Sequence, residues 1–421
     1  MQKLQFIAPK ELSQVYLVGG AVRDKLLGRP CHDRDFVVVG ESEQKMLSLG
    51  FLAVGDDFPV FLHASSKEEY ALARTERKTG KGYRGFSADA RQDITIEEDL
   101  ARRDLTINSM AMDANGKIID PFDGQKDLVK KVLKHTTAAF CEDPVRVLRL
   151  ARFYARLGPE WHIDDSTKQL MSNMHKNGEL SHLVAERVWK ETERALMEPY
   201  PHLFFETLIE FDLFPELLKM RGVPQPAKHH PEGDVYVHTM LVVQRAADLN
   251  LDLATRFAAL THDFGKPVAY EQFGKLHGHE QMGIEVIEGF CQRLKTPKKL
   301  ADIAKLTSDN HTHCHKINDL SSKTIHAFLI DKMNALKQEK RFLQFLDACA
   351  CDSQGRGPTM VNKPYFQADI AMSYLSSLKL LNAKKVVQQA LDNGKSGKQI
   401  SEALRTAEID NIRQHQLDLK D

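Results

Sequence analysis

Two carboxylates separated by one residue, Asp33 and Asp35, are the first side chains of this sequence whose spacing suggests chemistry. They precede the apolar run 36–39, which predicts that they lie at the start of a strand. Because side chains alternate along a strand, both carboxylates would point to the same side. Carboxylates held that close repel each other unless a cation lies between them, and Mg²⁺ prefers such oxygen ligands together with substrate phosphates. The pair therefore predicts a magnesium site for phosphate chemistry.

A glycine turn and a short helix precede the carboxylates and offer a place for phosphate. The apolar run 16–18 ends in Gly19 and Gly20, and residues 21–27 have the pattern of a helix closed by a glycine. Such a turn leaves backbone amides for a phosphate, and Arg23 lies one helical turn in. Taken separately, these residues would also fit an ordinary turn and two solvated aspartates.

The strings LVGGAVRD at residues 17–24 and DRDFVVVG at residues 33–40 resemble the head of the nucleotidyltransferase superfamily. Their form is similar to that of the bacterial class II tRNA nucleotidyltransferases, the CCA-adding enzymes. RRDLTINSMA at residues 102–111 resembles the RRD motif of this family, whose second arginine contacts the nucleotide triphosphate. The resemblance implies that Arg103 binds the triphosphate together with Gly20 and Arg23, and that Mg²⁺ bridges the triphosphate and the RNA 3′-hydroxyl.

A second signature of the same family, E-D-x-x-R, matches residues 142–146, and residues 185–191 resemble the neck motif that follows it. The resemblance implies that Asp143 and Arg146 select the base and that Arg149 supports the base or ribose. Cytosine and adenine each present an exocyclic amine beside a ring-nitrogen acceptor, so one carboxylate and one guanidinium can accept both CTP and ATP.

Further elements must position these residues. Segments 51–60 and 69–77 alternate as strands do, and Glu76 is a candidate third carboxylate for the magnesium site. The basic, glycine-rich loop 78–85 has a counterpart near the nucleotide in the family, with an ordinary surface hairpin as the alternative. Apolar residues recur at helical spacing over 98–111, which predicts a helix there.

A long helix is predicted to open at Pro144, where a first-turn proline is tolerated. Arginines recur along it at spacings of three and four, so that neighbouring ones share a face. Such a stripe is usually a solvated face, but here it begins with the base-selecting signature. Its members are Arg146, Arg149, Arg152 and Arg156.

A second group of chemistry-bearing residues follows the proline- and glycine-rich stretch 221–231, whose composition predicts a linker between domains. Imidazoles and carboxylates on separate helices can converge on a divalent metal, although a lone histidine is usually structural. The predicted ligands are His238, His262, Asp263 and Asp352, with His279 and His311 as candidate additions. Their spread resembles the HD phosphohydrolase superfamily, which implies an all-helical fold, Ni²⁺ or another divalent transition metal, and 2′,3′-cyclic phosphodiesterase, 2′-nucleotidase and phosphatase activity.

Composition sets limits on the class of protein. The chain has 421 residues, more than one hydrophobic core usually supports, and 58 basic against 58 acidic side chains, so any basic surface must be local. No apolar run approaches the ~20 residues that span a membrane, and the N-terminus has no signal-peptide pattern. Six scattered cysteines form no disulfide framework. We expect a reduced cytoplasmic protein, a monomer with a homodimer as the alternative.

These observations predict an α+β chain, with a small mixed sheet in an N-terminal nucleotidyltransferase head and helices elsewhere. The expected parts are the head at 1–140, a helical neck and body at 141–222, an HD domain at 228–355 and a helical tail at 356–421. The expected function is addition of CCA to the tRNA 3′ end from CTP and ATP. The alternatives are a poly(A) polymerase, an enzyme that adds only A or only CC, and a non-catalytic RNA-binding protein with a degenerate head.

Overall fold

The structure is a computed structural model, and it describes residues 6, 8–31, 33–54, 60–78, 86–89 and 91–419, with backbone only for 76–78 and 86–89. The chain forms two compact units, Met1–Thr192 and Glu193–Asp421. The first contains a mixed β-sheet and the second is helical, which confirms the predicted α+β class. The finer four-part division stays a prediction. None of the helices that the structure describes combines the length and the apolar character needed to cross a bilayer.

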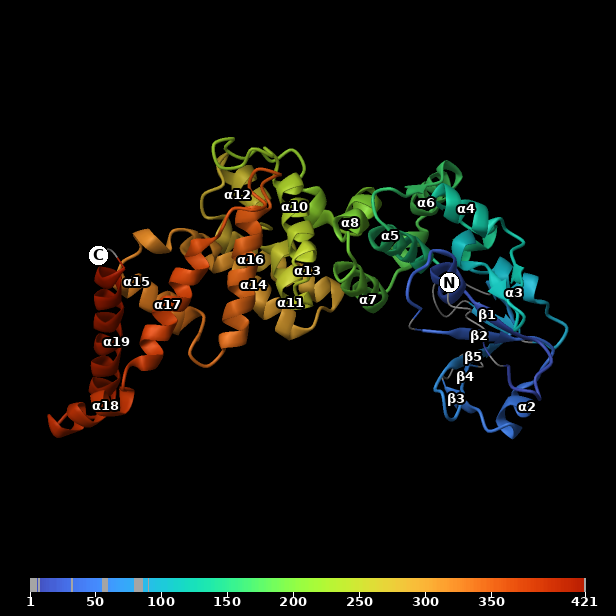
Figure 1. Ribbon diagram of the computed structural model, residues 1–421. Helices are drawn as coiled ribbons and strands as arrows, with labels where there is room; N and C mark the ends of the chain where they lie inside the picture. The colour runs from blue at the N-terminus through green and yellow to red at the C-terminus, as the bar shows by residue number, and fades with distance from the viewer. Residues whose placement is uncertain are drawn as a thin grey trace. The chain divides into compact units, whose positions relative to one another are not determined.

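A seven-stranded sheet forms the base of the first unit, with strand order β3-β4-β5-β2-β1-β8-β9 (Figure 1). The pair β2–β5 is parallel and the other pairs are antiparallel. Register places Val18, at the end of β1, opposite both Asp35 on β2 and Ala111 on β8. The glycine turn after β1 and the beginning of β2 therefore lie at the same end of these two neighbouring strands. The strands are β1 (Val15–Val18), β2 (Asp35–Val38), β3 (Leu52–Val54), β4 (Val60–Leu62), β5 (Glu69–Leu72), β8 (Ala111–Met112) and β9 (Ile118–Ile119).

Two predicted strands are wrong in extent. Segment 51–60 contains β3 and only the first residue of β4, its antiparallel neighbour, and residues 55–59 lie outside the described part. Segment 69–77 divides into β5 and β6 (Thr75–Lys78), and β6 pairs with β7 (Phe86–Asp89) in a separate sheet. Of the predicted loop 78–85, residues 79–85 also lie outside the described residues.

The helix predicted over 98–111 is wrong beyond its first residues. A capping box of Thr95 and Glu98 starts α3 (Ile96–Ala101), but a 3₁₀ turn at Thr106–Asn108 and strand β8 follow. The cause is Asp104, whose carboxylate accepts from the backbone N–H of Leu105 and from the side-chain amide of Asn108. Side chains that bond to nearby backbone in this way compete with the helix.

Helices cover the rest of the first unit. The predicted arginine-bearing helix is α5, which starts directly after Pro144 and buries Val147, Leu148 and Ala151 completely. The short pair β10–β11 is parallel and joins the segments before and after α5. The elements are α1 (Gly20–Leu26), α2 (Glu43–Ser48), α4 (Gly124–Lys130), β10 (Val132–Leu133), η2 (Ala138–Glu142), α5 (Val145–Leu157), β11 (His162–Ile163), α6 (Asp165–Lys176), η3 (Glu179–His182) and α7 (Ala185–Leu196).

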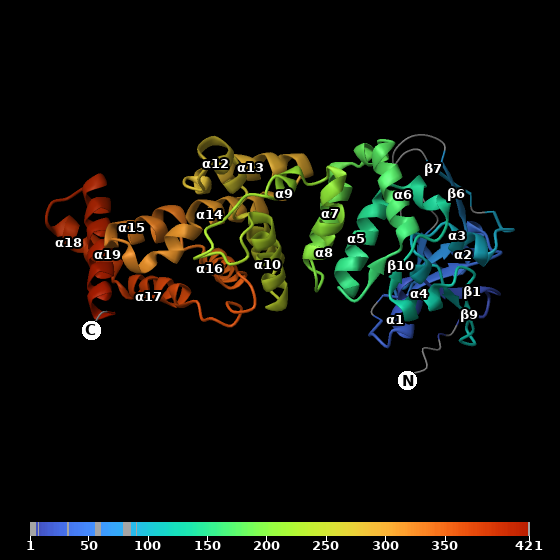
Figure 2. The same cartoon turned by 90° about the horizontal axis from the view of Figure 1, so that it is seen from above.

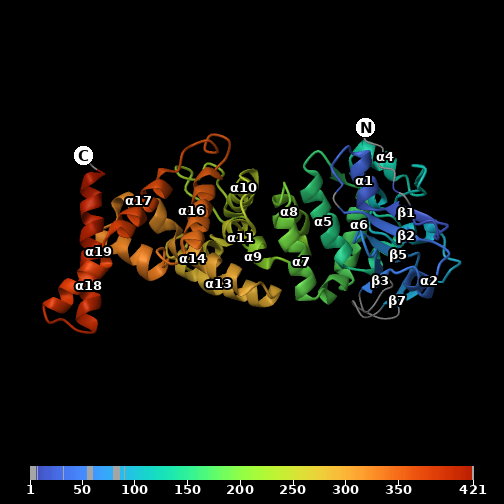
Figure 3. The same cartoon turned by 60° about the horizontal axis from the view of Figure 1, so that its bottom comes forward.

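In the second unit, α11 packs against α10, α14 and α16, and α13 runs beside α14 (Figure 2, Figure 3). The predicted tail at 356–421 is helical, and its described part contains α17, α18 and α19. The main helices are α8 (His202–Leu208), α9 (Pro215–Leu218), α10 (Val235–Asp248), α11 (Leu253–Thr261), α12 (Lys266–Phe273), α13 (His279–Leu294), α14 (Lys298–His315), α15 (Ser322–His326), α16 (Glu339–Gln354), α17 (Phe366–Leu380), α18 (Ala383–Asp392) and α19 (Lys398–Asp418).

Among the glycines that the structure describes in this unit, Gly265 lies nearest to other backbone atoms. A Cβ atom there would lie 1.9 Å from the carbonyl oxygen of His279 and 2.5 Å from the backbone nitrogen of Gly283. A Cβ on Gly283 would in turn lie 2.2 Å from the hydroxyl of Ser308 on α14. The start of α13 can therefore approach the α11–α12 turn only because a glycine stands at each contact.

We expect Gly265→Ala to destabilise the second unit by about 1–3 kcal/mol or more, because its contacts are backbone atoms that cannot move aside. Gly289→Ala is the matched control, since Gly289 is an exposed residue of α13 with open space at its Cβ position. The control should be neutral or stabilising by about 0.5–1 kcal/mol. Urea unfolding of both variants measures the difference, and equal stabilities would contradict the close approach.

Candidate active sites

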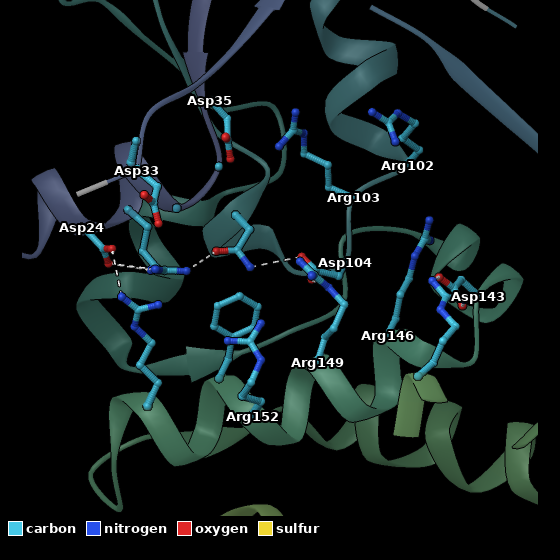
Figure 4. A pocket seen from close by; sticks show the side chains of 18 of the residues that line it. Asp24, Asp33, Asp35, Arg102, Arg103, Asp104, Asp143, Arg146, Arg149 and Arg152 are labelled. Atoms are coloured by element: carbon cyan, nitrogen blue, oxygen red, sulfur yellow. Dashed lines mark hydrogen bonds and ion pairs between the residues drawn. The ribbon is translucent and has the colours of Figure 1, made fainter. Parts of the chain in front are cut away.

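A cavity of about 560 Å³ in the first unit lies between the glycine turn, the RRD segment and α5 (Figure 4). Its lining is dominated by charge, with eight arginines and five aspartates. The excess of guanidinium groups suits a polyanion, and the carboxylates suit a cation beside it. The charged lining residues are Arg23, Arg102, Arg103, Arg146, Arg149, Arg152, Arg156, Arg187, Asp24, Asp33, Asp35, Asp104 and Asp143.

The carboxylate pair lines this cavity, but only Asp35 belongs to the strand, as the first residue of β2. Asp33 lies on the segment before it, so alternation along a strand is not what brings the two together. Partial burial raises the pKa of Asp35, Arg103 lowers it and Asp33 raises it again. A cation would relieve the repulsion, which fits a magnesium site. Glu76 lies in β6, and its side chain is outside the part of the chain that the structure describes.

The glycine turn lies at one end of the cavity. Gly19 has φ +66°, and a Cβ there would lie 3.1 Å from Arg103 Nη1, so a larger residue would be strained and crowded. Gly20 is the first residue of α1, and Arg23 one turn later is buried. Its Nη1 donates to Asn108 Oδ1 at 2.6 Å and its Nε donates to Asp24 Oδ1 at 2.9 Å. Arg23 therefore joins α1 to the RRD segment as well as lining the cavity.

One buried carboxylate orients both arginines of the RRD motif. Asp99 Oδ1 accepts from Arg102 Nη2 at 2.8 Å, and Asp99 Oδ2 accepts from Arg103 Nη2 at 3.0 Å. Burial alone would raise the pKa of Asp99, but Arg103 and Arg102 hold it below its usual value. Arg103 is thereby held beside Asp35 (Figure 4). Sequence reasoning missed Asp99, although its spacing of three and four from the two arginines was a usable signal.

The arginine stripe of α5 is a solvated face only in part, because Arg146 and Arg152 are buried while the side chains of Arg149 and Arg156 are 37% and 40% exposed. Each guanidinium has a partner on another segment, which orders the side chains along the cavity wall. Arg146 Nη1 donates to the carbonyl of Ala139 at 2.5 Å, Arg149 Nε to Asp104 at 2.8 Å and Arg152 Nε to Glu191 at 2.7 Å, while Arg156 Nη2 lies 3.6 Å from Asp24.

Two further aspartates fix the same wall. Asp143 Oδ1 accepts from the backbone N–H of Val145 at 3.0 Å, and Arg187 of α7 lies 3.3 Å away. Asp104 is buried, and although burial would raise its pKa, Arg149 and the hydrogen bonds it accepts lower that pKa to about 2. Sequence reasoning assigned no role to Asp104 or Arg187, even though both lie inside quoted motifs.

A second cluster lies within the second unit, where four helices and the turn after α11 bring six predicted ligands together. All six are buried. His238 Nε2 lies 3.1 Å from Asp352 Oδ1, and His279 Nε2 lies 3.2 Å from His311 Nε2. Both candidate additions, His279 and His311, therefore belong to the same cluster as the four principal residues. His238 lies on α10, His262 and Asp263 follow α11, His279 starts α13, His311 lies on α14 and Asp352 on α16.

Asp263 is the centre of this cluster. Its Oδ2 lies 3.1 Å from His262 Nε2, and its Oδ1 lies 3.5 Å from His279 Nε2 and 3.7 Å from His311 Nε2. Lys266 Nζ lies 2.6 Å from Oδ2, whereas Oδ1 and His262 Nε2 have neither a hydrogen bond nor a lysine or arginine partner. Buried atoms left in this way cost free energy unless a cation satisfies them. The mixed imidazole and carboxylate donors fit a borderline transition metal.

The carboxylates of the cluster are ionised, but its histidines differ in charge, because burial alone would lower the pKa of His262 but Asp263 raises it. Burial alone would raise the pKa values of Asp263 and Asp352, yet their histidine neighbours hold both well below the usual range. Burial lowers the pKa of His311 to about 3, which leaves its imidazole neutral. Ionised carboxylates and neutral imidazoles are the forms that ligate metals. Two flanking cations that sequence reasoning left without a role are Lys266, 2.6 Å from Asp263, and Arg356, 3.1 Å from Asp352.

Family models match three parts of the chain. Residues 15–134 match the poly A polymerase head domain, residues 161–221 a probable RNA and SrmB-binding site of polymerase A, and residues 235–351 the HD domain. The head cavity and the histidine cluster thus fall within separately recognised segments.

Curated relatives match the chain along nearly its whole length. The chain is 48% identical over 408 residues to a multifunctional CCA protein of Teredinibacter turnerae, covering 95% of this chain and 97% of that protein. It is 49% identical over 402 residues to one of Pseudoalteromonas atlantica, covering 94% and 98%. Among solved structures, it is similar to the Bacillus stearothermophilus CCA-adding enzyme in complex with CTP, with a TM-score of 0.62 and 22% identity, covering 96% of this chain and 89% of that one. At that identity the likeness shows the fold.

Proposed function

The chain belongs to the multifunctional CCA protein family and is a tRNA nucleotidyltransferase with an HD phosphohydrolase domain. From this premise we propose that it adds C, C and A in turn to the tRNA 3′ end. CTP and ATP are the substrates, no nucleic-acid template takes part, and pyrophosphate leaves at each step. The observation that carries this proposal is the cavity in which a carboxylate pair faces eight arginines.

Nucleotidyl transfer is mostly positioning and charge neutralisation. Asp33 and Asp35 would hold Mg²⁺, which supplies the neutralising charge on the triphosphate and on the attacking 3′-hydroxyl. Arg103, aimed by Asp99, and the amides at Gly20 hold the triphosphate. Arg23 also lines the triphosphate site, and its guanidinium is held in place by hydrogen bonds to Asp24 and Asn108.

Base selection is assigned to Asp143 and Arg146, which line the same cavity. A carboxylate accepts from the exocyclic amine of cytosine or adenine, and a guanidinium donates to the neighbouring ring nitrogen. Uracil and guanine present a carbonyl and an N–H at these places, so both contacts would be lost. Contacts from Arg187 to Asp143 and from Arg146 to Ala139 limit the freedom of both side chains, and Arg149 supports the base or ribose.

An enzyme that adds only A or only CC would use the same residues, and so would a poly(A) polymerase, although such polymerases usually lack the HD domain. The histidine cluster is assigned hydrolysis of 2′,3′-cyclic phosphodiesters, 2′-nucleotides and phosphate esters with Ni²⁺ or another divalent transition metal. Its support is the set of buried imidazoles and carboxylates around Asp263.

Asp33→Ala and Asp35→Ala should each abolish addition of both C and A to a tRNA that lacks its 3′ end. The assay offers CTP and ATP separately and together, which also separates full CCA addition from A-only, CC-only and poly(A) synthesis. Asp93→Ala, an exposed aspartate of the same unit, is the control and should be normal. Wild-type incorporation by either variant would remove the pair from the mechanism.

Asp143→Asn and Arg146→Ala should loosen base choice. One good polar pair contributes about 1–3 kcal/mol of discrimination, so incorporation of UTP and GTP should rise roughly tenfold or more relative to CTP and ATP. Arg156→Ala is a control on the same helix and in the same cavity, and it should slow addition without changing base preference. If Asp143→Asn and Arg146→Ala keep wild-type selectivity at reduced rate, the bases are read elsewhere.

His262→Ala should abolish hydrolysis of 2′,3′-cyclic nucleotides while tRNA 3′-end addition continues near its normal rate. The reason is that the histidine cluster shares no residue with the cavity of the first unit. His313→Ala, an exposed histidine of α14, should leave both activities unchanged. Loss of both activities in His262→Ala, with a large drop in melting temperature, would mean that His262 and Asp263 are a structural pair.

A further inference from the structure

The proline- and glycine-rich stretch predicted as a linker is a folded part of the second unit. The segment 222–234 closes on itself, because Gly222 N–H donates to Asp234 Oδ2 at 2.7 Å and Gln225 N–H donates to the carbonyl of Gly233 at 2.9 Å. Pro224 and Asp234 form an isolated β-bridge, and Asp234 caps α10. The segment therefore has a fixed path directly before the helix that carries His238.

Along that path the segment contacts one side chain of the histidine cluster and the two cations that flank the cluster. Gln225 Oε1 accepts from Lys266 Nζ at 2.5 Å, and the carbonyl of His229 accepts from Arg356 Nη1 at 3.3 Å. These are the two cations that pair with Asp263 and Asp352. The third contact is to a predicted ligand itself, since Glu232 Oε1 lies 2.7 Å from His238 Nδ1.

Glu232 is a buried carboxylate between two imidazoles. Its side chain is 3% exposed, and the same Oε1 atom lies 2.9 Å from Nδ1 of His230. The side chain of His238 is completely buried, so water cannot replace this contact. The contact between Glu232 Oε1 and His230 Nδ1 is a hydrogen bond, whereas His238 Nδ1 makes a close contact with the same oxygen without meeting the angle of a hydrogen bond.

An imidazole that donates its Nδ1 proton keeps a lone pair on Nε2, which is the atom that can ligate a metal. In His238 that Nε2 faces the cluster, 3.1 Å from Asp352 Oδ1 and 3.7 Å from Asp263 Oδ2. With the proton on Nδ1, the Nε2 lone pair and the Asp352 oxygen are adjacent acceptors with no hydrogen between them. A proton on Nε2 would instead give the hydrogen bond to Asp352 that the 3.1 Å distance allows, so binding of a metal at Nε2 requires the ring proton to lie on Nδ1.

We propose that Glu232 is a positioning residue of the HD metal centre, which accepts the Nδ1 proton of His238 and thereby presents Nε2 to a divalent metal. The inference rests on the proposed function, in which the cluster binds such a metal. The segment 222–234 is then the outer layer of the centre, because it also holds the cations beside Asp263 and Asp352.

The alternative is that His230, Glu232 and His238 form a metal site of their own, since their donor atoms lie within 4.8 Å of one another. That arrangement would require His238 to ligate through Nδ1 and to give up its role at Nε2, or to lose both ring protons. Substitution of His230 separates the two possibilities, because only a separate site needs it.

The test measures binding of Ni²⁺ alone to the full chain by competition with a chromophoric chelator. Glu232→Ala should weaken affinity about 10- to 100-fold, the range found when an outer partner of a metal-bound histidine is removed. Glu232→Gln keeps the volume and one acceptor oxygen, so it should fold normally and recover part of the affinity. His230→Ala, and Glu271→Ala at an exposed glutamate of α12, should bind as the wild type does.

The visible spectrum of the Co²⁺-loaded protein gives a readout that stability alone does not move, and it should change in Glu232→Ala but not in Glu271→Ala. Nickel affinity of Glu232→Ala within twofold of wild type, with an unchanged cobalt spectrum, would overturn the positioning role. Loss of one metal equivalent in His230→Ala would overturn it in favour of the separate site. If the wild type binds no metal at all, the proposed function of the cluster fails, which is a different outcome from failure at Glu232.

Discussion

A relay of hydrogen bonds between charged and polar side chains holds the walls of the nucleotide cavity together. Asp104 accepts from Arg149 and from Asn108, Asn108 accepts from Arg23, and Arg23 donates to Asp24 (Figure 4). These side-chain contacts join α5, the RRD segment and α1, beside the backbone hydrogen bond from Gly19 to Met110. Breaking a buried pair leaves an uncompensated charge, at a cost of about 3–5 kcal/mol. The relay therefore constrains where the glycine turn and the arginine helix stand relative to each other.

In the second unit, close packing of the backbone positions the side chains of the histidine cluster. Its cluster draws on residues separated by up to 114 positions, as in the contact between His238 and Asp352. Glycines at 265 and 283 let α13 approach the turn after α11, so that His279 reaches Asp263. Charged side chains then complete the centre, because the carboxylates at its heart are each paired with a cation as well as with imidazoles.

What the sequence predicts best is local chemistry. Asp35 and the arginines of α5 lie on the strand and the helix that their motifs predict, and they line one cavity together with Arg103. The helix predicted over 98–111 was wrong, because apolar spacing does not show that the side chain of Asp104 takes the place of a backbone acceptor. Contacts such as the one between Arg187 and Asp143 depend on tertiary packing. The contact of Glu232 with His238 could not be predicted from composition, since prolines and glycines predict a linker even where the chain is folded.

The charge of the cavity has a consequence for how the protein meets a nucleotide. Eight arginines and five aspartates give the cavity an excess of three positive charges, and the whole chain has none, so the remaining residues carry an excess of three negative charges. The phosphates of a nucleotide that enters the cavity therefore meet a local positive charge that the chain as a whole does not have.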